Sequence, residues 1–496
     1  MDIKLIFPPF EQNTYDRCLL PPLSIVSLHS YLKKRGYNSR LYDLELESFL
    51  SVKSKSKINF QVLSDRQRIK KYLEGKKDFY LELQLERIIN SFEMFDHNVF
   101  CFSIIDISQL FISLAIAKFL TKKYQSTIIF GGPYITLNKG FVLEQFCFVD
   151  YEITGASEDS LYQLILSLDK KLDVSKVPNL LYAKDGKTVY NTNKEFDINN
   201  SEMPDFNALP IEKYRVNGNL VLPYQLVSGC NENCFFCAHR TINPLIKMKD
   251  VDKVIKELKE LKEKHNVRHF YFCDNLINAD NSYLEELCDR IIEEELDILW
   301  IDHAKPDILS QELMQKIRKS GCVQLYYGIE SASESVLKKM NKHLSINDVK
   351  KCLELSHKAG IWNHVSFIVG YLGETEKDFD TTLNFILENK NAIDSIMVSP
   401  FYIPKKSIIY NNPSRFNVAL NISDSTQVMV SFDDLTNQNS EEVITDRMTK
   451  IGSLIDKFNL FPFKLKNNKI LSINMFFDLC SELKDKSIFK QRIKTL

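Results

Sequence analysis

The chain has 496 residues, of which 44% are hydrophobic and 26% charged, and its formal net charge is −1. This is the composition of a globular protein with two or three domains, and the near-zero charge argues against a nucleic acid bound mainly through its phosphates. The eleven cysteines are mostly scattered without paired spacing. That argues against a disulfide framework and favours a reducing compartment.

The start of the chain and its longest apolar stretch bear on location. The first seven residues lead straight into a predicted strand and have no signal-peptide layout. Residues 100–120 are the longest apolar stretch, but they include Asp106, Gln109 and Lys118, and so fit a buried strand and helix better than a membrane span. We therefore expect a cytoplasmic protein with no membrane partner.

Residues 1–172 are predicted to form a first domain in which strands and helices alternate. Its short apolar strands, with helices at 24–34 and 108–124, predict a doubly wound parallel sheet. Residues 50–95 are charged and helix-prone, and are predicted to be a helical insertion. The predicted strands are 3–7, 39–44, 98–104, 127–130 and 151–154.

Glycines follow the last two strands of this sheet. Gly131 and Gly132 come directly after residues 127–130, and Gly155 follows residues 151–154. Ligands of doubly wound sheets bind beyond the carboxyl ends of the strands, which is where these glycines lie. Their spacing alone favours tight turns into the following helices.

Residues 223–410 are predicted to be a partial (β/α)6 barrel, whose site should lie at the carboxyl ends of its strands. A connecting segment, residues 173–222, precedes it and contains a hairpin around Asp185-Gly186. Residues 411–496 are predicted to be a mainly helical cap over the barrel mouth that helps to set specificity. The six barrel strands are expected near 224–227, 269–272, 298–301, 324–327, 365–369 and 395–399.

Three cysteines, Cys230, Cys234 and Cys237, lie in the loop after the first of these strands. Three thiolates at this spacing can hold three corners of a [4Fe–4S] cluster and leave the fourth iron open for chemistry. The alternative is a zinc site that His239 completes as a Cys₃His set. Structural zinc is nearly always four-coordinate and no second C-x-x-C follows at zinc-ribbon distance, which favours the cluster.

The C-x-x-x-C-x-x-C spacing, with Phe236 just before the last cysteine, resembles the signature of the radical S-adenosylmethionine (radical SAM) superfamily. The resemblance extends over residues 1–410 or so, and implies a [4Fe–4S] cluster whose open iron binds S-adenosylmethionine (SAM). It implies that an electron from an external donor, flavodoxin-like or ferredoxin-like, cleaves the sulfonium to a 5′-deoxyadenosyl radical. Phe236 would then pack near the adenine.

Further segments of the barrel resemble family motifs. Asp274 follows the second strand, where the resemblance implies a contact with the amino group of SAM; the alternative is a helix cap. Glu330 and Ser331 end a Gly-Ile-Glu-Ser segment after the fourth strand, where the resemblance implies contacts with bound SAM. The alternative for Glu330 is a partner of a helix N-terminus. Gly370 opens a segment similar to the family's G-x-P-G-E-T, with leucine for proline, which implies a close backbone approach to the adenine.

The N-terminal part is similar to the cobalamin-binding domain that is fused to many radical SAM enzymes. The matching segments are Pro8-Pro9, Pro21-Pro22-Leu23-Ser24, Lys34-Arg35-Gly36-Tyr37 and Gly131-Gly132-Pro133. The resemblance implies that Gly131, Gly132 and Gly155 let the nucleotide tail of cobalamin lie against the backbone. The D-x-H-x-x-G motif, whose histidine ligates cobalt in many cobalamin proteins, is absent. Either cobalamin binds without a protein histidine, or the domain keeps the fold and has lost the cofactor.

The leading hypothesis from this resemblance is a cobalamin-dependent radical SAM enzyme that methylates an unactivated carbon of a peptide or small molecule. The first alternative keeps the cluster but performs a radical rearrangement, cyclisation or oxidation. A methylthiotransferase fits less well, because the first third of the chain lacks three cysteines placed for a second cluster. The alternative of another class is a non-catalytic metal- or cobalamin-binding protein, which would leave SAM uncleaved.

Overall fold

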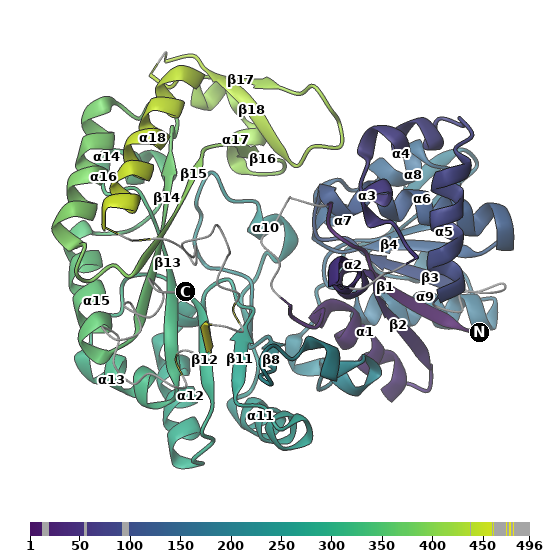
Figure 1. Ribbon diagram of the computed structural model, residues 1–496, viewed down its shortest axis with the longest axis horizontal. Coiled ribbons are helices and arrows are strands. Elements are labelled where there is room, and N and C mark those ends of the chain that lie inside the picture. The colour runs from purple at the N-terminus through teal and green to yellow at the C-terminus, as the bar shows by residue number, and fades with distance from the viewer. Residues whose placement is uncertain are drawn as a thin grey trace. The chain divides into compact units, whose positions relative to one another are not determined.

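The computed structural model describes residues 1–11, 19–53, 57–91, 99–436 and 438–458, together with Leu460, Ile473, Phe476, Phe477 and Cys480. The chain divides into two units (Figure 1). Unit 1 comprises residues 1–214 and 424–428, and unit 2 comprises residues 215–423 and 429–496. Each unit is built around one sheet of mainly parallel strands. Among the described helices, none is both long and apolar enough to cross a bilayer.

The sheet of unit 1 has seven strands. They are β1 Ile3–Phe7, β2 Ser39–Asp43, β3 Val99–Ser103, β4 Thr127–Gly131, β5 Tyr151–Ile153, β6 Leu180–Lys184 and β7 Lys187–Tyr190. Their order is β2-β1-β3-β4-β5-β6-β7, and the first five in this order are parallel, which confirms the predicted doubly wound sheet. The β6–β7 turn has positive φ at Asp185 (51°) and Gly186 (72°), as in a type I′ hairpin, which confirms the predicted turn. The hairpin extends the sheet of unit 1.

Helices cover both faces of this sheet. They are α1 Leu23–Lys34, α2 Leu44–Lys53, α3 Phe60–Leu63, α4 Arg66–Leu73, α5 Phe79–Ser91, α6 Ile107–Tyr124, α7 Pro133–Leu137, α8 Phe141–Gln145 and α9 Glu158–Lys170. Ile3 and Leu5 of β1 belong to a core shared with α1 and α9, whereas Ile6 belongs to a core shared with α4, α5 and α6. Strands that are buried on both faces are near-continuous apolar runs, which is why the sequence locates them well. The predicted insertion contains the end of α2 and all of α3, α4 and α5, and its residues 54–56 and 92–95 lie outside the described residues.

A short loop from late in the chain, residues 424–428, completes unit 1. The side chain of Tyr134 is buried, and its hydroxyl donates to the carbonyl oxygen of Thr426 at 2.7 Å. Lys70 Nζ lies 3.1 Å from the carboxylate of Asp424. One buried and one surface contact therefore join this loop to the rest of unit 1.

Unit 2 contains a six-stranded parallel sheet in the order β8-β11-β12-β13-β14-β15. These strands are β8 Val221–Tyr224, β11 His269–Phe272, β12 Leu299–Ala304, β13 Cys322–Glu330, β14 Trp362–Val369 and β15 Ser395–Pro400. No described strand joins β15 back to β8, so the predicted partial (β/α)6 barrel is confirmed. The first strand ends at Tyr224, three residues earlier than expected. The segment β9 Val227–Ser228 instead pairs antiparallel with β10 Lys247–Met248.

The helices of the barrel lie outside its sheet. They are α10 His239–Ile242, α11 Val251–His265, α12 Asn281–Glu293, α13 Gln311–Lys319, α14 Glu334–Met340, α15 Ile346–Ala359 and α16 Glu376–Asn389. Figure 1 shows α13, α15 and α16 along one side of the sheet. The 3₁₀ turns of both units are η1 Val174–Lys176, η2 Ile198–Asn200, η3 Phe206–Ala208, η4 Ile211–Tyr214, η5 Ile277–Ala279 and η6 Pro413–Phe416.

The region after the barrel contains a small antiparallel sheet as well as helices. Its elements are β16 Ile403–Pro404, α17 Ile408–Asn411, β17 Val418–Asn421, β18 Met429–Asp434 and α18 Glu441–Phe458. The β17–β18 hairpin adds strands to a region that was predicted to be mainly helical. Phe476 packs edge-on against Trp362, and Phe477 stacks on His269. Trp362 and His269 are the first residues of β14 and β11, so these phenylalanines lie at the amino ends of the strands. The predicted cap over the barrel mouth stays a prediction.

Candidate active site

The cysteine loop begins at a position that only glycine can fill. Gly229 has a φ of +87°, and a Cβ added there would overlap the carbonyl oxygen of Leu245. Both the left-handed backbone and the close approach require glycine. The β9–β10 pair flanks this contact and closes the base of the loop. Residues 230–246 therefore leave the sheet from a fixed base.

We expect Gly229→Ala to destabilise unit 2 by more than about 1 kcal/mol, because alanine is strained at positive φ and would meet the Leu245 carbonyl. Urea unfolding of the metal-free protein, followed by tryptophan fluorescence, measures this, since Trp300 and Trp362 both lie in unit 2. The matched control is Gly218→Ala, at a φ of +84° with nothing within 4 Å of an added Cβ. Equal losses in the two variants would mean that the close approach contributes nothing.

The three thiols of the loop are unpaired and partly exposed. Cys230, Cys234 and Cys237 form no disulfide, and the amide of Cys237 donates to the carbonyl of Cys234 at 3.1 Å. Burial raises the pKa of all three thiols, that of Cys234 to about 12, while the charge of Lys342 acts to lower it. Within the described part of the chain, no three His, Cys, Asp or Glu side chains are gathered as they would be around a single metal ion. Three free thiols on one loop fit three corners of a [4Fe–4S] cluster.

A segment that no sequence motif marks, residues 340–343, holds the cysteine loop. The amide of Phe235 donates to the carbonyl of Met340 at 2.9 Å. Asn341 Nδ2 donates to the carbonyl of Asn233 at 2.8 Å, across 108 positions of sequence. These two contacts hold the loop at one point between Cys230 and Cys234 and at one point between Cys234 and Cys237.

The carboxylate of Glu330 is held in one place at the end of β13. The strand bulges between Gly328 and Glu330, and Glu330 has a φ of +68°, which is rare for a residue with a side chain. Its Oε1 lies 3.2 Å from Lys342 Nζ, and its Oε2 accepts a hydrogen bond from Ser366 Oγ at 3.3 Å. A Cβ on Gly328 would lie 2.5 Å from Glu330 Oε1, so the glycine makes room for the carboxylate. Burial acts to lower the pKa of Lys342, but the charges of Glu330 and Cys234 raise it, and Lys342 stays a cation beside the loop.

The loop also carries its own carboxylate, Glu232, between the first two cysteines. Lys305 Nζ lies 2.7 Å from Glu232 Oε1 and 3.2 Å from Asp307 Oδ2, and His343 Nδ1 lies 3.7 Å from Glu232 Oε2. Because the Lys305–Glu232 pair is partly exposed, its contribution to stability is small. The ion pair instead fixes the position of the cysteine loop relative to Lys305, the residue that follows β12.

Asp274 lies buried and holds the turn between β8 and β9. Its Oδ1 accepts hydrogen bonds from the amides of Leu226 and Val227, each at 2.9 Å. Burial raises the pKa of Asp274, and burial together with the charge of Asp274 raises that of Asp302, a fully buried carboxyl that the sequence did not mark. The two carboxyls are therefore coupled, and the charged form of each is disfavoured. The predicted contact of Asp274 with the amino group of SAM stays a prediction.

Ser331 and Gly370 have partners within the protein. Ser331 is fully buried, and its Oγ lies 3.3 Å from Thr382 Oγ1. Its predicted contact with SAM stays a prediction. Gly370 has a φ of +80°, and a Cβ there would lie 2.6 Å from Ile444 of α18. Its amide donates to Glu374 Oε2 at 2.7 Å. Helix α18 thus covers one face of Gly370, and the predicted backbone approach to adenine remains a prediction for the other.

The three glycines of unit 1 lie at the carboxyl ends of β4 and β5. Gly131 makes only ordinary contacts. Gly132 has a φ of +103°, and a Cβ there would lie 2.5 Å from the carbonyl oxygen of Ile104, so it permits close packing beside the end of β3. Gly155 has a φ of +68° with nothing within 4 Å of an added Cβ, so its outer face is open.

Unit 1 contains two histidines, His29 and His97, which are its candidates for a cobalt ligand. His29 is buried on α1, and its Nδ1 lies 2.8 Å from Ser39 Oγ. His97 lies outside the described residues. In the described part of unit 1, therefore, the one histidine is engaged in the core between α1 and β2.

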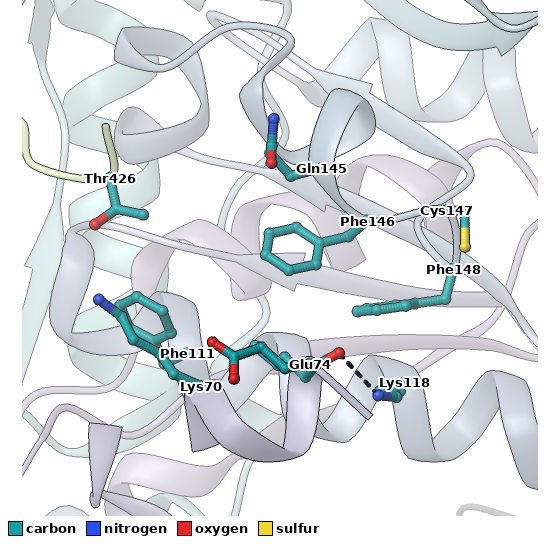
Figure 2. A pocket seen from close by; sticks show the side chains of 10 residues that line it. Lys70, Glu74, Phe111, Lys118, Gln145, Phe146, Cys147, Phe148 and Thr426 are labelled. Atoms are coloured by element: carbon teal, nitrogen blue, oxygen red, sulfur yellow. Dashed lines mark hydrogen bonds between the residues drawn. The ribbon is translucent and has the colours of Figure 1, made fainter. Parts of the chain in front are cut away.

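Unit 1 also contains a cavity of about 480 Å³ lined by three phenylalanine rings together with charged and polar side chains (Figure 2). Phe111 of α6 lines it together with Phe146 and Phe148, which lie in the loop before β5. Lys118 lies at its edge and donates to the carbonyl of Leu73 at 3.0 Å. Neither Gly131-Gly132 nor Gly155 lines this cavity, so it is separate from the strand ends that carry the glycines.

The fold is a parallel partial barrel, and three free thiols lie on the loop after its first strand. These two features define a class of protein that binds a metal cluster at the carboxyl edge of a sheet. Residues 224–386 match the family model of the Radical SAM superfamily. The chain therefore contains a radical SAM domain, and the resemblance drawn from the cysteine motif is confirmed. The matched range includes all three cysteines.

Solved cobalamin-dependent radical SAM enzymes share the fold of the chain. The radical SAM methyltransferase TsrM from Kitasatospora setae, solved with cobalamin and a [4Fe–4S] cluster bound, superposes with a TM-score of 0.63 at 12% identity, over 85% of this chain and 81% of that one. OxsB, a cobalamin-dependent enzyme solved with aqua-cobalamin and SAM bound, gives 0.61 at 17% identity, over 96% and 63%. At these identities the likeness establishes the fold.

Curated relatives match about half of the chain. An uncharacterized methyltransferase of Pyrococcus horikoshii is 25% identical over 264 residues, 52% of this chain and 57% of the relative. The anaerobic magnesium-protoporphyrin IX monomethyl ester cyclase of Rubrivivax gelatinosus is 28% identical over 285 residues, 55% of this chain and 51% of the relative. The chain thus spans about half the length of these relatives.

Proposed function

We propose that this chain is a radical SAM enzyme that cleaves S-adenosylmethionine reductively at a [4Fe–4S] cluster held by Cys230, Cys234 and Cys237. The observation that carries the proposal is the set of three free, partly exposed thiols on one anchored loop. When bound, the cluster supplies the electron that breaks a carbon–sulfur bond of SAM. A flavodoxin-like or ferredoxin-like protein is the expected electron donor.

The residues around the loop have complementary tasks. Lys342, held 3.2 Å from Glu330, offsets the negative charge that three thiolates bring to the loop. The carboxylate of Glu330 accepts hydrogen bonds from ribose hydroxyls or an ammonium group. The ring of Phe236 is supported edge-on by Tyr371 at 6.3 Å and offers an apolar surface to the adenine. Asp274 acts indirectly, because it holds the turn from which the loop departs.

The proposed reaction is cobalamin-dependent methylation of an unactivated carbon in a peptide or small molecule. The fold shared with TsrM and OxsB supports it, and so does the open face of Gly155 at the carboxyl end of β5. Cobalamin, when bound, supplies a carrier for the methyl group. Because His29 is engaged with Ser39, the proposal is for a cobalamin that His29 does not ligate.

A second reaction is favoured by one observation, the 28% identity between this chain and the cyclase of Rubrivivax gelatinosus. A radical cyclisation, rearrangement or oxidation would use the same cysteine loop without methyl transfer. A non-catalytic metal- or cobalamin-binding protein is the alternative of another class. It would bind the same groups and leave SAM intact.

Metal analysis after anaerobic preparation with cobalamin tests the proposal. We expect about four irons and one cobalt per chain, and 5′-deoxyadenosine from SAM after chemical reduction. The triple variant Cys230→Ala/Cys234→Ala/Cys237→Ala should lose the iron and keep the cobalt. Iron without cobalt would favour the second reaction, and four irons without SAM cleavage would favour the non-catalytic alternative.

A further inference from the structure

Three neighbouring strands of the unit 2 sheet place aromatic side chains in one row. His303 of β12 pairs in register with Tyr326 of β13, and Tyr326 with His364 of β14. The rings of His303 and Tyr326 stack with centroids 4.9 Å apart and 27° between their planes, and Tyr326 meets His364 edge-on at 4.8 Å. Directly paired residues point to the same face of a sheet. The three rings therefore form one aromatic row across three strands.

The face that carries this row and Glu330 is partly exposed. Gly328 and Ser366 pair with each other two residues further toward the carboxyl ends, and both contribute little side-chain bulk. Ser366 Oγ donates to Glu330 Oε2, which places the carboxylate on the same face. The side chain of His303 is 43% exposed, and Met397, which pairs with Ser366, is 52% exposed. His303 and Met397 are thus exposed on the face that carries Glu330.

The row is uncharged at neutral pH. Burial lowers the pKa of His303 to about 4 and that of His364 to about 3, so both imidazoles are neutral. His364 Nδ1 lies 2.7 Å from Ser395 Oγ, which uses one of its hydrogen-bonding positions. His303 Nδ1 has no hydrogen-bond partner among the described residues; the nearest carboxylate, that of Asp302, lies 3.9 Å away. His303 thus offers a partly exposed ring face, whereas its Nδ1 is buried.

We propose that this row is the floor of the substrate site, and that the substrate carries an uncharged planar ring, aromatic or heteroaromatic, which stacks on His303. The inference rests on the proposed function and names the substrate class of that site. Ring faces attract one another at centroid distances of about 4.5–7 Å, and the exposed thioether of Met397 adds a sulfur–aromatic contact. Two residues along a strand span roughly 7 Å, so a ring on His303 would lie one such step from the layer of Gly328 and Ser366, beside Glu330.

Ligand-observed saturation-transfer NMR on the full chain, without metal, tests the inference with indole as the probe. Octahydroindol-2-one, an uncharged saturated bicycle of similar size, is the matched ligand. We expect a clear indole signal with the unaltered protein, a signal about fivefold weaker with His303→Leu, and recovery with His303→Phe, which restores a ring. Phe79→Leu, which removes an aromatic ring that is 78% exposed in unit 1, controls for binding to surface rings and should change nothing.

Two outcomes would overturn the inference. One is an equal signal from indole and octahydroindol-2-one with the unaltered protein, a comparison that needs no variant to fold. The other is an indole signal that Phe79→Leu lowers and His303→Leu does not. Failure of the proposed function is a separate result, because it would appear as no 5′-deoxyadenosine from the iron-loaded protein while indole still binds.

Discussion

Replacement of Cys234 by alanine is expected to abolish the cleavage of S-adenosylmethionine by the iron-loaded protein. A cluster held at three corners loses a third of its protein ligands, and the iron that Cys234 would hold becomes open to solvent. Changes to residues that only support a metal ligand cost about 10–100-fold, so loss of a ligand should cost more than about 100-fold. The measurement is 5′-deoxyadenosine formed per chain after anaerobic reconstitution and reduction.

The matched control for this variant is Cys147→Ala. Cys147 is an exposed cysteine of unit 1 that lies outside the cysteine loop. It should keep the iron content and the cleavage rate of the unaltered protein. Full SAM cleavage by Cys234→Ala would exclude Cys234 as a cluster ligand. Loss of iron and of SAM cleavage in Cys147→Ala alone would indicate a metal site in unit 1.

Replacement of Arg447 by methionine is expected to lower the free energy of unfolding of unit 2 by about 3–5 kcal/mol. Arg447 Nη1 lies 3.1 Å from Glu374 Oε2, and the two side chains are only 2% and 1% exposed. Arg447 also donates to Asn439 Oδ1 at 2.8 Å, and its Nε lies 3.1 Å from Glu376. Without the guanidinium, the buried carboxyl of Glu374 has no compensating charge. Urea unfolding followed by tryptophan fluorescence measures the loss.

This loss should depend on pH. Burial already raises the pKa of Glu374 to about 7, against an ordinary value of 4.5. In the unaltered protein stability therefore already falls as the pH rises from 4.5 through 7, because the folded state keeps a proton that the unfolded chain releases. Loss of the Arg447 charge raises the pKa of Glu374 further, so Arg447→Met goes on losing stability above pH 7 and the difference between the two proteins widens there. Adding Glu374→Gln should remove this dependence. The control is Lys450→Met, which removes an ion pair to Glu376 at a side chain that is 45% exposed and should cost less than about 1 kcal/mol.

The strands were predicted most accurately where both of their faces are covered. The bounds expected for β1 and β11 agree with the structure, because each is a short apolar run that ends at a turn or loop. The first barrel strand was placed three residues late. Residues 220–227 are nearly all apolar, and only pairing determines where β8 ends. Pro223 weakens a strand prediction, yet β8 is the edge of its sheet, where a missing amide is tolerated.

The residues of the site that are recognised by their spacing along the sequence could be predicted. Those that come together only through the register of strand pairing could not. The cysteines and the glycines of the turns stand out because their roles follow from their neighbours in sequence. Lys342, Asp302 and the row that begins at His303 come together only through the pairing of β12, β13 and β14 or the packing of a distant turn. None of them has a sequence pattern of its own.

The loop of residues 424–428 has a consequence for the order in which the protein is made. The carbonyl that accepts the hydrogen bond of Tyr134 belongs to Thr426, 292 positions later. While the chain is being synthesised, unit 1 emerges with this buried hydroxyl unsatisfied, and it reaches its final structure only after most of unit 2 has left the ribosome. A gene fragment that stops at residue 214 would therefore encode an incomplete unit 1.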